Sequence, residues 1–116
     1  MGYRSDIIFA CVADAVPIML AEVGKSPALK ELLFADADEK LLGDYDSEGS
    51  YLFRWNSIKW YDGYQAIQAF NEMIKKIEDK LDDEAYRFIR MGEELGDDEI
   101  EGCGFDNIYV SREIVY

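Results

Sequence analysis

The side chains of this sequence that could form a binding or catalytic site are mainly carboxylates, which are numerous and closely spaced. The 116 residues include 25 Asp and Glu against 12 Lys and Arg, which gives a formal net charge of −13. The densest segment, residues 93–101, carries Glu93, Glu94, Asp97, Asp98, Glu99 and Glu101. If extended, it presents one charge per roughly 5 Å, which approaches the one phosphate per about 3.4 Å of a DNA strand. Two interpretations stay open: a solvated surface, or a surface that competes with nucleic acid for a basic protein.

Residue types exclude several kinds of catalytic and metal site. The chain has no histidine, so the most common general base and the most common metal ligand are missing. Cys11 and Cys103 form no CxxC pair, which argues against structural zinc and favours two reduced thiols. The turn at 44–49 resembles the start of a calcium loop, but Trp55 stands where that loop needs its bidentate Glu. We therefore predict no cofactor, no metal site and no enzymatic activity.

A second candidate surface is aromatic. Trp55, Trp60, Tyr61 and Tyr64 lie close together in the sequence, and aromatic side chains are enriched at the centres of protein interfaces. Aromatic residues of strands usually pack into the core, so we expect Trp55 and Trp60 to be buried. Tyr61 and Tyr64 flank an Asp-Gly turn and are expected at the surface. The candidate partner-binding residues are thus these two tyrosines and the six acids of residues 93–101.

The periodicity of the apolar residues predicts the helices and strands that would position these residues. We expect these elements to form a single domain over residues 1–116. Asp14 and Ser26 are candidate N-caps of two helices, and a break of parity at residues 56–57 predicts a β-bulge. Residues 93–101 have only two apolar members and are predicted to form an exposed loop. The predicted elements, in order, are a strand at 6–13, helices from 14 and from 26, a hairpin over 41–61, a helix over 64–81, and strands at 86–91 and 107–116.

This order predicts an α+β fold in which helices lie on one face of a mixed or antiparallel sheet. The nearest common solution is ferredoxin-like, βαββαβ, with an added strand at the C-terminal end. The longest apolar stretch, Ile7–Val12, is far shorter than the roughly 20 residues that cross a bilayer. The strong negative charge opposes direct binding to nucleic acid or to an anionic membrane surface.

Four short segments are spread over most of the chain: Tyr3–Asp6, Lys59–Tyr64, Phe88–Glu94 and Val110–Ile114. In this order and spacing they resemble a family of small acidic proteins of bacteriophages and prophages. The resemblance implies a phage setting and a location in the host cytoplasm, and it transfers no catalytic residue.

These observations predict a non-enzymatic phage protein that binds and blocks a basic host, phage or defence protein by acidic mimicry. The expected partner is itself a nucleic-acid-binding protein, and the chain would contact neither nucleic acid nor membrane. The alternative is a structural or assembly protein that self-associates, for example as a homodimer, through a sheet edge or an aromatic patch.

Overall fold

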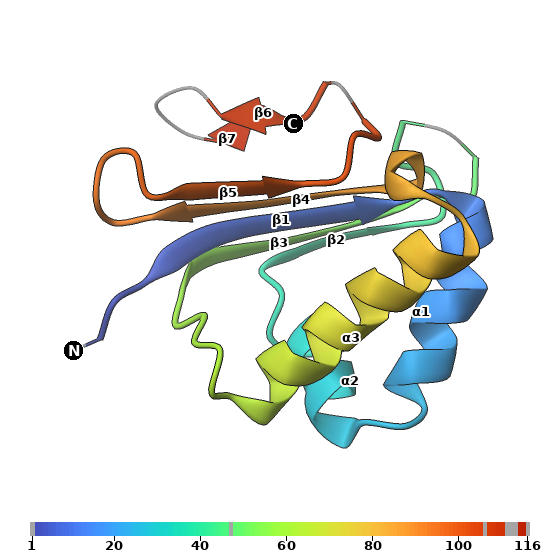
Figure 1. Cartoon of the computed structure of the whole chain (residues 1–116), viewed down its shortest axis with the longest axis horizontal. Coiled ribbons are helices and arrows are strands. Elements are labelled where there is room, and N and C mark those ends of the chain that lie inside the picture. Colours follow the sequence, from blue (N-terminus) through green and yellow to red (C-terminus); the bar gives the residue numbers. More distant parts are fainter. Residues whose placement is uncertain (1, 47, 106, 111–113, 116) are drawn as a thin grey trace.

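The computed structural model describes residues 2–46, 48–105, 107–110 and 114–115, and a single antiparallel sheet organises most of them (Figure 1). In this described part, five strands pair in the order β2-β3-β1-β4-β5. Every neighbouring pair is antiparallel. The strands are β1 (Ser5–Cys11), β2 (Glu39–Leu42), β3 (Tyr51–Ile58), β4 (Tyr86–Gly92) and β5 (Asp98–Glu101).

Three α-helices lie on one side of this sheet, and a short hairpin lies on the other (Figure 1). The helices are α1 (Val16–Val23), α2 (Pro27–Phe34) and α3 (Gln65–Lys80). The hairpin consists of β6 (Tyr109–Val110) and β7 (Ile114–Val115), which pair with each other. The predicted α+β class is confirmed, whereas the ferredoxin-like assignment within that class stays a prediction.

The main core lies between the sheet and the helices, and α3 contributes most to it. Its buried residues recur at three- and four-residue steps, which places them on one face of the helix. Phe70 is at the centre, where its ring lies 5.3 Å from that of Phe9, 5.0 Å from that of Trp60 and 5.4 Å from that of Phe88. The helix is therefore held against β1 and β4 by aromatic packing.

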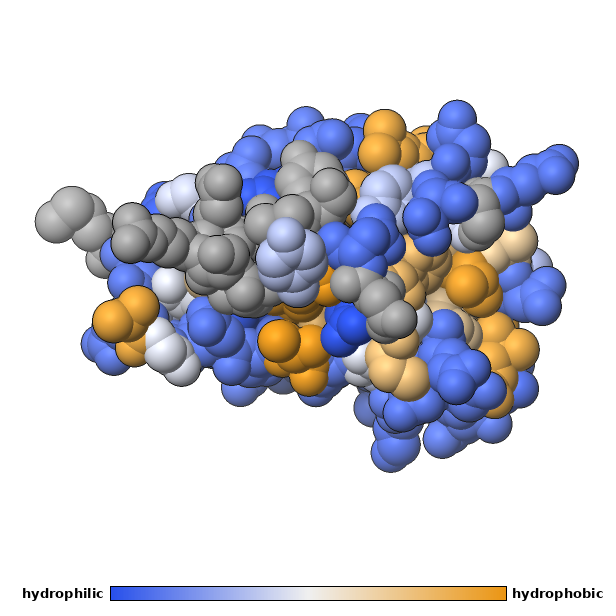
Figure 2. Space-filling view, turned by 90° about the horizontal axis from the view of Figure 1, so that it is seen from above, coloured by the Kyte–Doolittle hydropathy of each residue, from blue (hydrophilic) through white to orange (hydrophobic). Residues whose placement is uncertain are grey.

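A smaller apolar cluster lies on the opposite face of the sheet. Ile8, Leu52 and Ile89 are fully buried there, and Ile108 covers them from the C-terminal segment. Both faces of β1 are covered, which agrees with its apolar side chains at both parities from Ile7 to Cys11, as expected for a central strand. Seen from this side, the surface is mainly hydrophilic, with apolar atoms visible between the charged residues (Figure 2).

Two local predictions are confirmed and one is wrong. Ser5 pairs with Ile58 and Ile7 with Trp55, so β3 has one extra residue at the predicted bulge. The hydroxyl of Ser26 accepts a hydrogen bond from the backbone N–H of Leu29 (3.2 Å), which confirms the cap of α2. Asp14 does not cap α1, because it lies within a 3₁₀ turn that ends before the helix begins.

The largest difference concerns the acidic segment. Residues 93–101 were predicted as an exposed loop, but residues 98–101 form β5, which extends the sheet beyond β4. Gly96, with a φ of 85°, occupies the turn that brings the chain back along β4. The added strand was expected from residues 107–116, of which 111–113 and 116 lie outside the described residues. The sheet is therefore extended by the acidic segment, and among the described residues β6 pairs with β7 outside the five-stranded sheet.

Among the described residues, no helix combines the length and the apolar character needed to cross a membrane.

Candidate functional site

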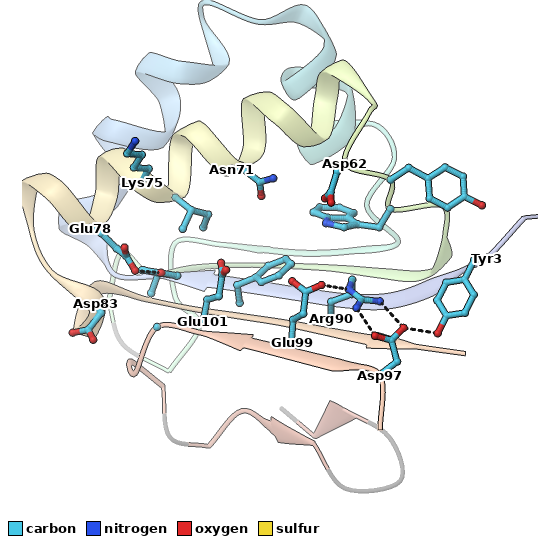
Figure 3. Close-up of a pocket in the computed structure, with 16 residues that line it drawn as sticks. Tyr3, Asp62, Asn71, Lys75, Glu78, Asp83, Arg90, Asp97, Glu99 and Glu101 are labelled. Carbon is cyan, nitrogen blue, oxygen red and sulfur yellow. Dashed lines mark hydrogen bonds and ion pairs between the residues drawn. The ribbon is translucent and has the colours of Figure 1, made fainter. Parts of the chain in front are cut away.

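A groove of about 700 Å³ lies between α3 and the outer strands β4 and β5 (Figure 3). Phe70 of α3 packs on β1 and on Phe88 of β4, while β5 is one strand further out. The helix-facing side of β5 is thus left open, and this opening is the groove. Its volume lies within the range of about 300–1,000 Å³ that is typical of ligand sites.

The pleat of β5 decides which acids face the groove. Glu101 is opposite Phe88 and Glu99 is opposite Arg90 in the β4–β5 register. Phe88 belongs to the core on the helix side, and directly opposed residues share a face of the sheet. Figure 3 accordingly shows Glu99 and Glu101 pointing from β5 toward α3. Asp98 and Ile100 have the other parity and face the opposite side.

Carboxylates outnumber cations around the groove, and aromatic side chains form its floor. The cationic residues among those that line it are Lys75 and Arg90. The floor includes Trp60, Tyr86 and Phe88. The six acidic residues are Asp62, Glu78, Asp83, Asp97, Glu99 and Glu101.

One of the two cations is fully engaged within the protein. The side chain of Arg90 is 12% exposed, and its Nη2 lies 2.8 Å from Oδ1 of Asp97. Its Nε lies 2.8 Å from Oε1 of Glu99. The guanidinium of Arg90, followed by the hydroxyl of Tyr3, holds the pKa of Asp97 below its usual value. The stability from this pairing is present at neutral pH and is lost as the pH falls through the lowered pKa.

Arg90→Ala is expected to lower the free energy of unfolding by about 1–2 kcal/mol, because it removes the hydrogen bonds that fix β5 to β4. Arg90→Lys should recover only part of this loss, since an ammonium cannot form the two-pronged contact of a guanidinium. Urea denaturation of the three proteins at neutral pH measures the difference. Equal stability of the wild type and Arg90→Ala would show that the ion pairs contribute nothing.

The acids that Arg90 does not engage are crowded by one another. Partial desolvation, followed by the charges of Glu99 and Glu78, raises the pKa of Glu101. A raised carboxyl pKa means that the folded state holds the proton more tightly, so protonation of Glu101 favours folding as the pH falls. A cation placed beside Glu101 would also stabilise the folded protein, because it would relieve the same repulsion among the carboxylates. The arrangement is therefore suited to holding a positively charged group above an aromatic floor.

The structure brings together only some of the candidate residues from the sequence. Asp97, Glu99, Glu101 and Tyr61 line the groove. The other candidates do not line it. Glu93, Glu94 and Asp98 lie along a neighbouring surface, and the ring of the exposed Tyr64 is tilted against that of Tyr61, with 5.1 Å between ring centres.

The helix side of the groove was not predicted from the sequence. Asn71, Lys75 and Glu78 are spaced by four and three residues, so they share one face of α3. That spacing was a usable signal, but nothing in the sequence indicated that this face would be opposite β5. Trp60 was expected in the core, but it is only partly buried and also lines the groove.

The thiols have the properties expected of unreactive cysteines. Cys11 is buried in β1, and burial raises its pKa to about 12. Cys103 is exposed, and partial desolvation together with a hydrogen bond to Asp83 raises its pKa. Both shifts reduce the thiolate fraction at neutral pH, which disfavours a nucleophilic role. Within the described ranges no group of acids and cysteines has the geometry to hold a metal ion.

No protein-family model, no curated protein and no solved structure matches the chain.

Proposed function

We propose that the protein is a non-enzymatic binding protein that captures a basic partner protein in the groove between α3 and β5. The observation that carries this proposal is the imbalance of charge in the groove: six carboxylates and two cations surround an aromatic floor. One of those cations, Arg90, is already paired with Asp97 and Glu99. Cationic side chains of a partner would supply the missing positive charge.

The aromatic floor favours arginine and lysine over simple metal ions. Trp60 lines the groove and is only partly buried, and a guanidinium can stack on such a ring while it bonds to a carboxylate. A desolvated contact of this kind contributes more than an exposed ion pair, because the floor excludes water from one side of the cation. The proposed site therefore combines charge recognition with apolar contact.

The geometry changes how acidic mimicry would operate. Successive residues of β5 point to opposite faces, so Glu99 and Glu101, which are two residues apart, are spaced by about 7 Å along one face. The charge that a partner meets comes instead from β5 and α3 together, as the positions of Glu101 and Glu78 in Figure 3 illustrate. Under this proposal a nucleic-acid-binding protein is blocked because its basic surface is occupied. The resemblance to phage proteins would place that partner in the host cytoplasm.

Capture of a partner from host lysate should depend on the groove acids and on salt. Asp62→Asn combined with Glu101→Gln removes two groove charges that form no ion pair with another residue of the described part of the chain, and should weaken affinity for the captured partner about tenfold. The measurement is affinity purification at 0.05 M and 0.5 M NaCl, followed by titration of the purified partner. Higher salt should reduce capture by the wild type, because it screens the attraction.

The matched control is Glu31→Gln combined with Asp36→Asn, which removes the same charge from an exposed position within α2 and another just after it. It should leave affinity nearly unchanged. If the two double variants weaken binding equally, bulk charge explains the capture and the groove is not the site.

The alternative, self-association, is favoured by one observation. Leu41 and Leu42 on the edge strand β2 are 36% and 49% exposed, and unprotected apolar edges invite pairing between chains. A dimer in analytical ultracentrifugation, with no partner captured at either salt concentration, would support this alternative.

A further inference from the structure

We infer that the basic partner of the proposed site binds as an extended segment that adds a strand to the outer edge of β5. This inference rests on the proposed function and specifies the form of the partner: basic residues alternating with apolar ones. In the described part of the chain, β5 ends the sheet next to β4, and no further strand pairs with it. Strand addition to such an edge is a common mode of peptide recognition.

The backbone of β5 has hydrogen-bonding groups that point away from the sheet. The N–H of Gly92 donates to the carbonyl of Asp97 (2.8 Å), and the N–H of Val12 donates to the carbonyl of Ala85 (2.9 Å). Bonded and non-bonded pairs alternate along antiparallel strands. The Gly92 bond makes Gly92 and Asp97 a bonded pair, so the pairs of Arg90 with Glu99 and of Phe88 with Glu101 are bonded as well, and the Val12 bond at the other end of β4 agrees with this phase. The backbone of Glu99 and Glu101 therefore faces β4. The N–H and C=O groups of Asp98 and Ile100 therefore point outward, where an added strand can pair with them.

The side chains of β5 determine the sequence pattern of the added strand. Glu99 and Glu101 point into the groove, whereas Ile100 is on the opposite face and is 53% exposed. Directly opposed side chains of an antiparallel pair lie about 5 Å apart. Basic residues of the partner would thus face the two glutamates, and an apolar residue between them would cover Ile100.

A second copy of the chain is a poor occupant of this edge. Pairing β5 with another β5 would place acids directly opposite acids or one position away, which is destabilising. The opposite edge of the sheet, β2, has the sequence Glu-Lys-Leu-Leu, and none of its residues lines the acidic groove. Charge complementarity therefore assigns a basic segment to the β5 edge.

Three synthetic peptides test the inference directly: a capped eight-residue peptide of alternating arginine and valine, and two versions that carry backbone N-methyl groups. In antiparallel pairing, a valine opposite Ile100 uses its N–H toward β5, whereas the arginine N–H groups point outward. N-methylation of the valines should weaken binding at least tenfold. N-methylation of the arginines should change it less than threefold. Titration calorimetry at 0.15 M NaCl measures all three.

Amide hydrogen exchange provides a second measurement that needs no variant. The unmodified peptide should slow exchange of the Ile100 N–H at least tenfold. If all three peptides bind alike with no slowing at Ile100, and the Asp62/Glu101 double variant weakens all three, strand addition is wrong while the proposed groove function stands. If no peptide binds, or if the groove variant and the Glu31/Asp36 control weaken binding equally, both are wrong.

Discussion

Phe70→Ala is expected to lower the free energy of unfolding by about 3–5 kcal/mol, the usual effect of truncating a fully buried aromatic residue. Phe70 has no exposed surface, and its ring contacts those of Phe9, Trp60 and Phe88. Truncation leaves a cavity. The surrounding rings belong to two strands and to the connection before α3, so they cannot fill it unless these segments move together. Since small domains are stable by only about 5–15 kcal/mol, this one change should remove a large part of the total.

Urea denaturation followed by circular dichroism is the appropriate measurement for Phe70→Ala. The neighbouring Asn71→Ala is the control, because Asn71 is exposed on the same helix and its replacement should change stability by less than about 0.5 kcal/mol. Similar losses for the two variants would contradict the packing of α3 against the sheet.

Added salt should stabilise the protein. At 0.01 M salt the Debye length is about 30 Å, comparable with the 35 × 30 × 23 Å dimensions of the molecule, so all of its acids repel one another. At 0.15 M the length falls to about 8 Å, and most of this repulsion is screened. With a net charge of −13, we expect the melting temperature to rise by about 4 °C, or about 1 kcal/mol for a domain of this size.

The Glu31/Asp36 double variant separates general repulsion from local pairing. It should melt at a higher temperature than the wild type at 0.01 M salt and show a smaller rise when salt is added. A melting temperature of the wild type that stays flat or falls between the two salt concentrations would show that ion pairs such as that of Arg90 with Asp97 outweigh the repulsion.

Periodicity predicted the elements whose residues face a core. The apolar positions of α3, such as Ile67, Phe70 and Ile77, recur with helical spacing and are buried as expected. The bulge of β3 could also be predicted, because a shift of one residue moves every later side chain to the other face. These features are local, because each depends on the sequence of a few neighbouring residues.

The groove could be predicted only in part, because it depends on pairing between distant segments. Residues 98–101 have few apolar members, so periodicity gave no reason to expect a strand. They pair because Arg90 on β4 bonds to Asp97 and Glu99, and because an edge strand tolerates charged residues on an open face. High acid density was visible in the sequence. Which acids would share a face with α3 was decided by the β4–β5 register.

The two tryptophans occupy different environments, and replacing either one with phenylalanine isolates the fluorescence of the other. Trp55 is fully buried, and its indole Nε1–H donates to the carbonyl of Leu32 (2.9 Å). Trp60 is partly buried, lies 5.5 Å from Trp55 between ring centres and lines the groove. In Trp60→Phe the remaining indole emission reports on unfolding of the core. In Trp55→Phe the remaining emission comes from Trp60 beside the groove, so it should change when a cation lies against that ring. Binding could then be followed without a fluorescent label.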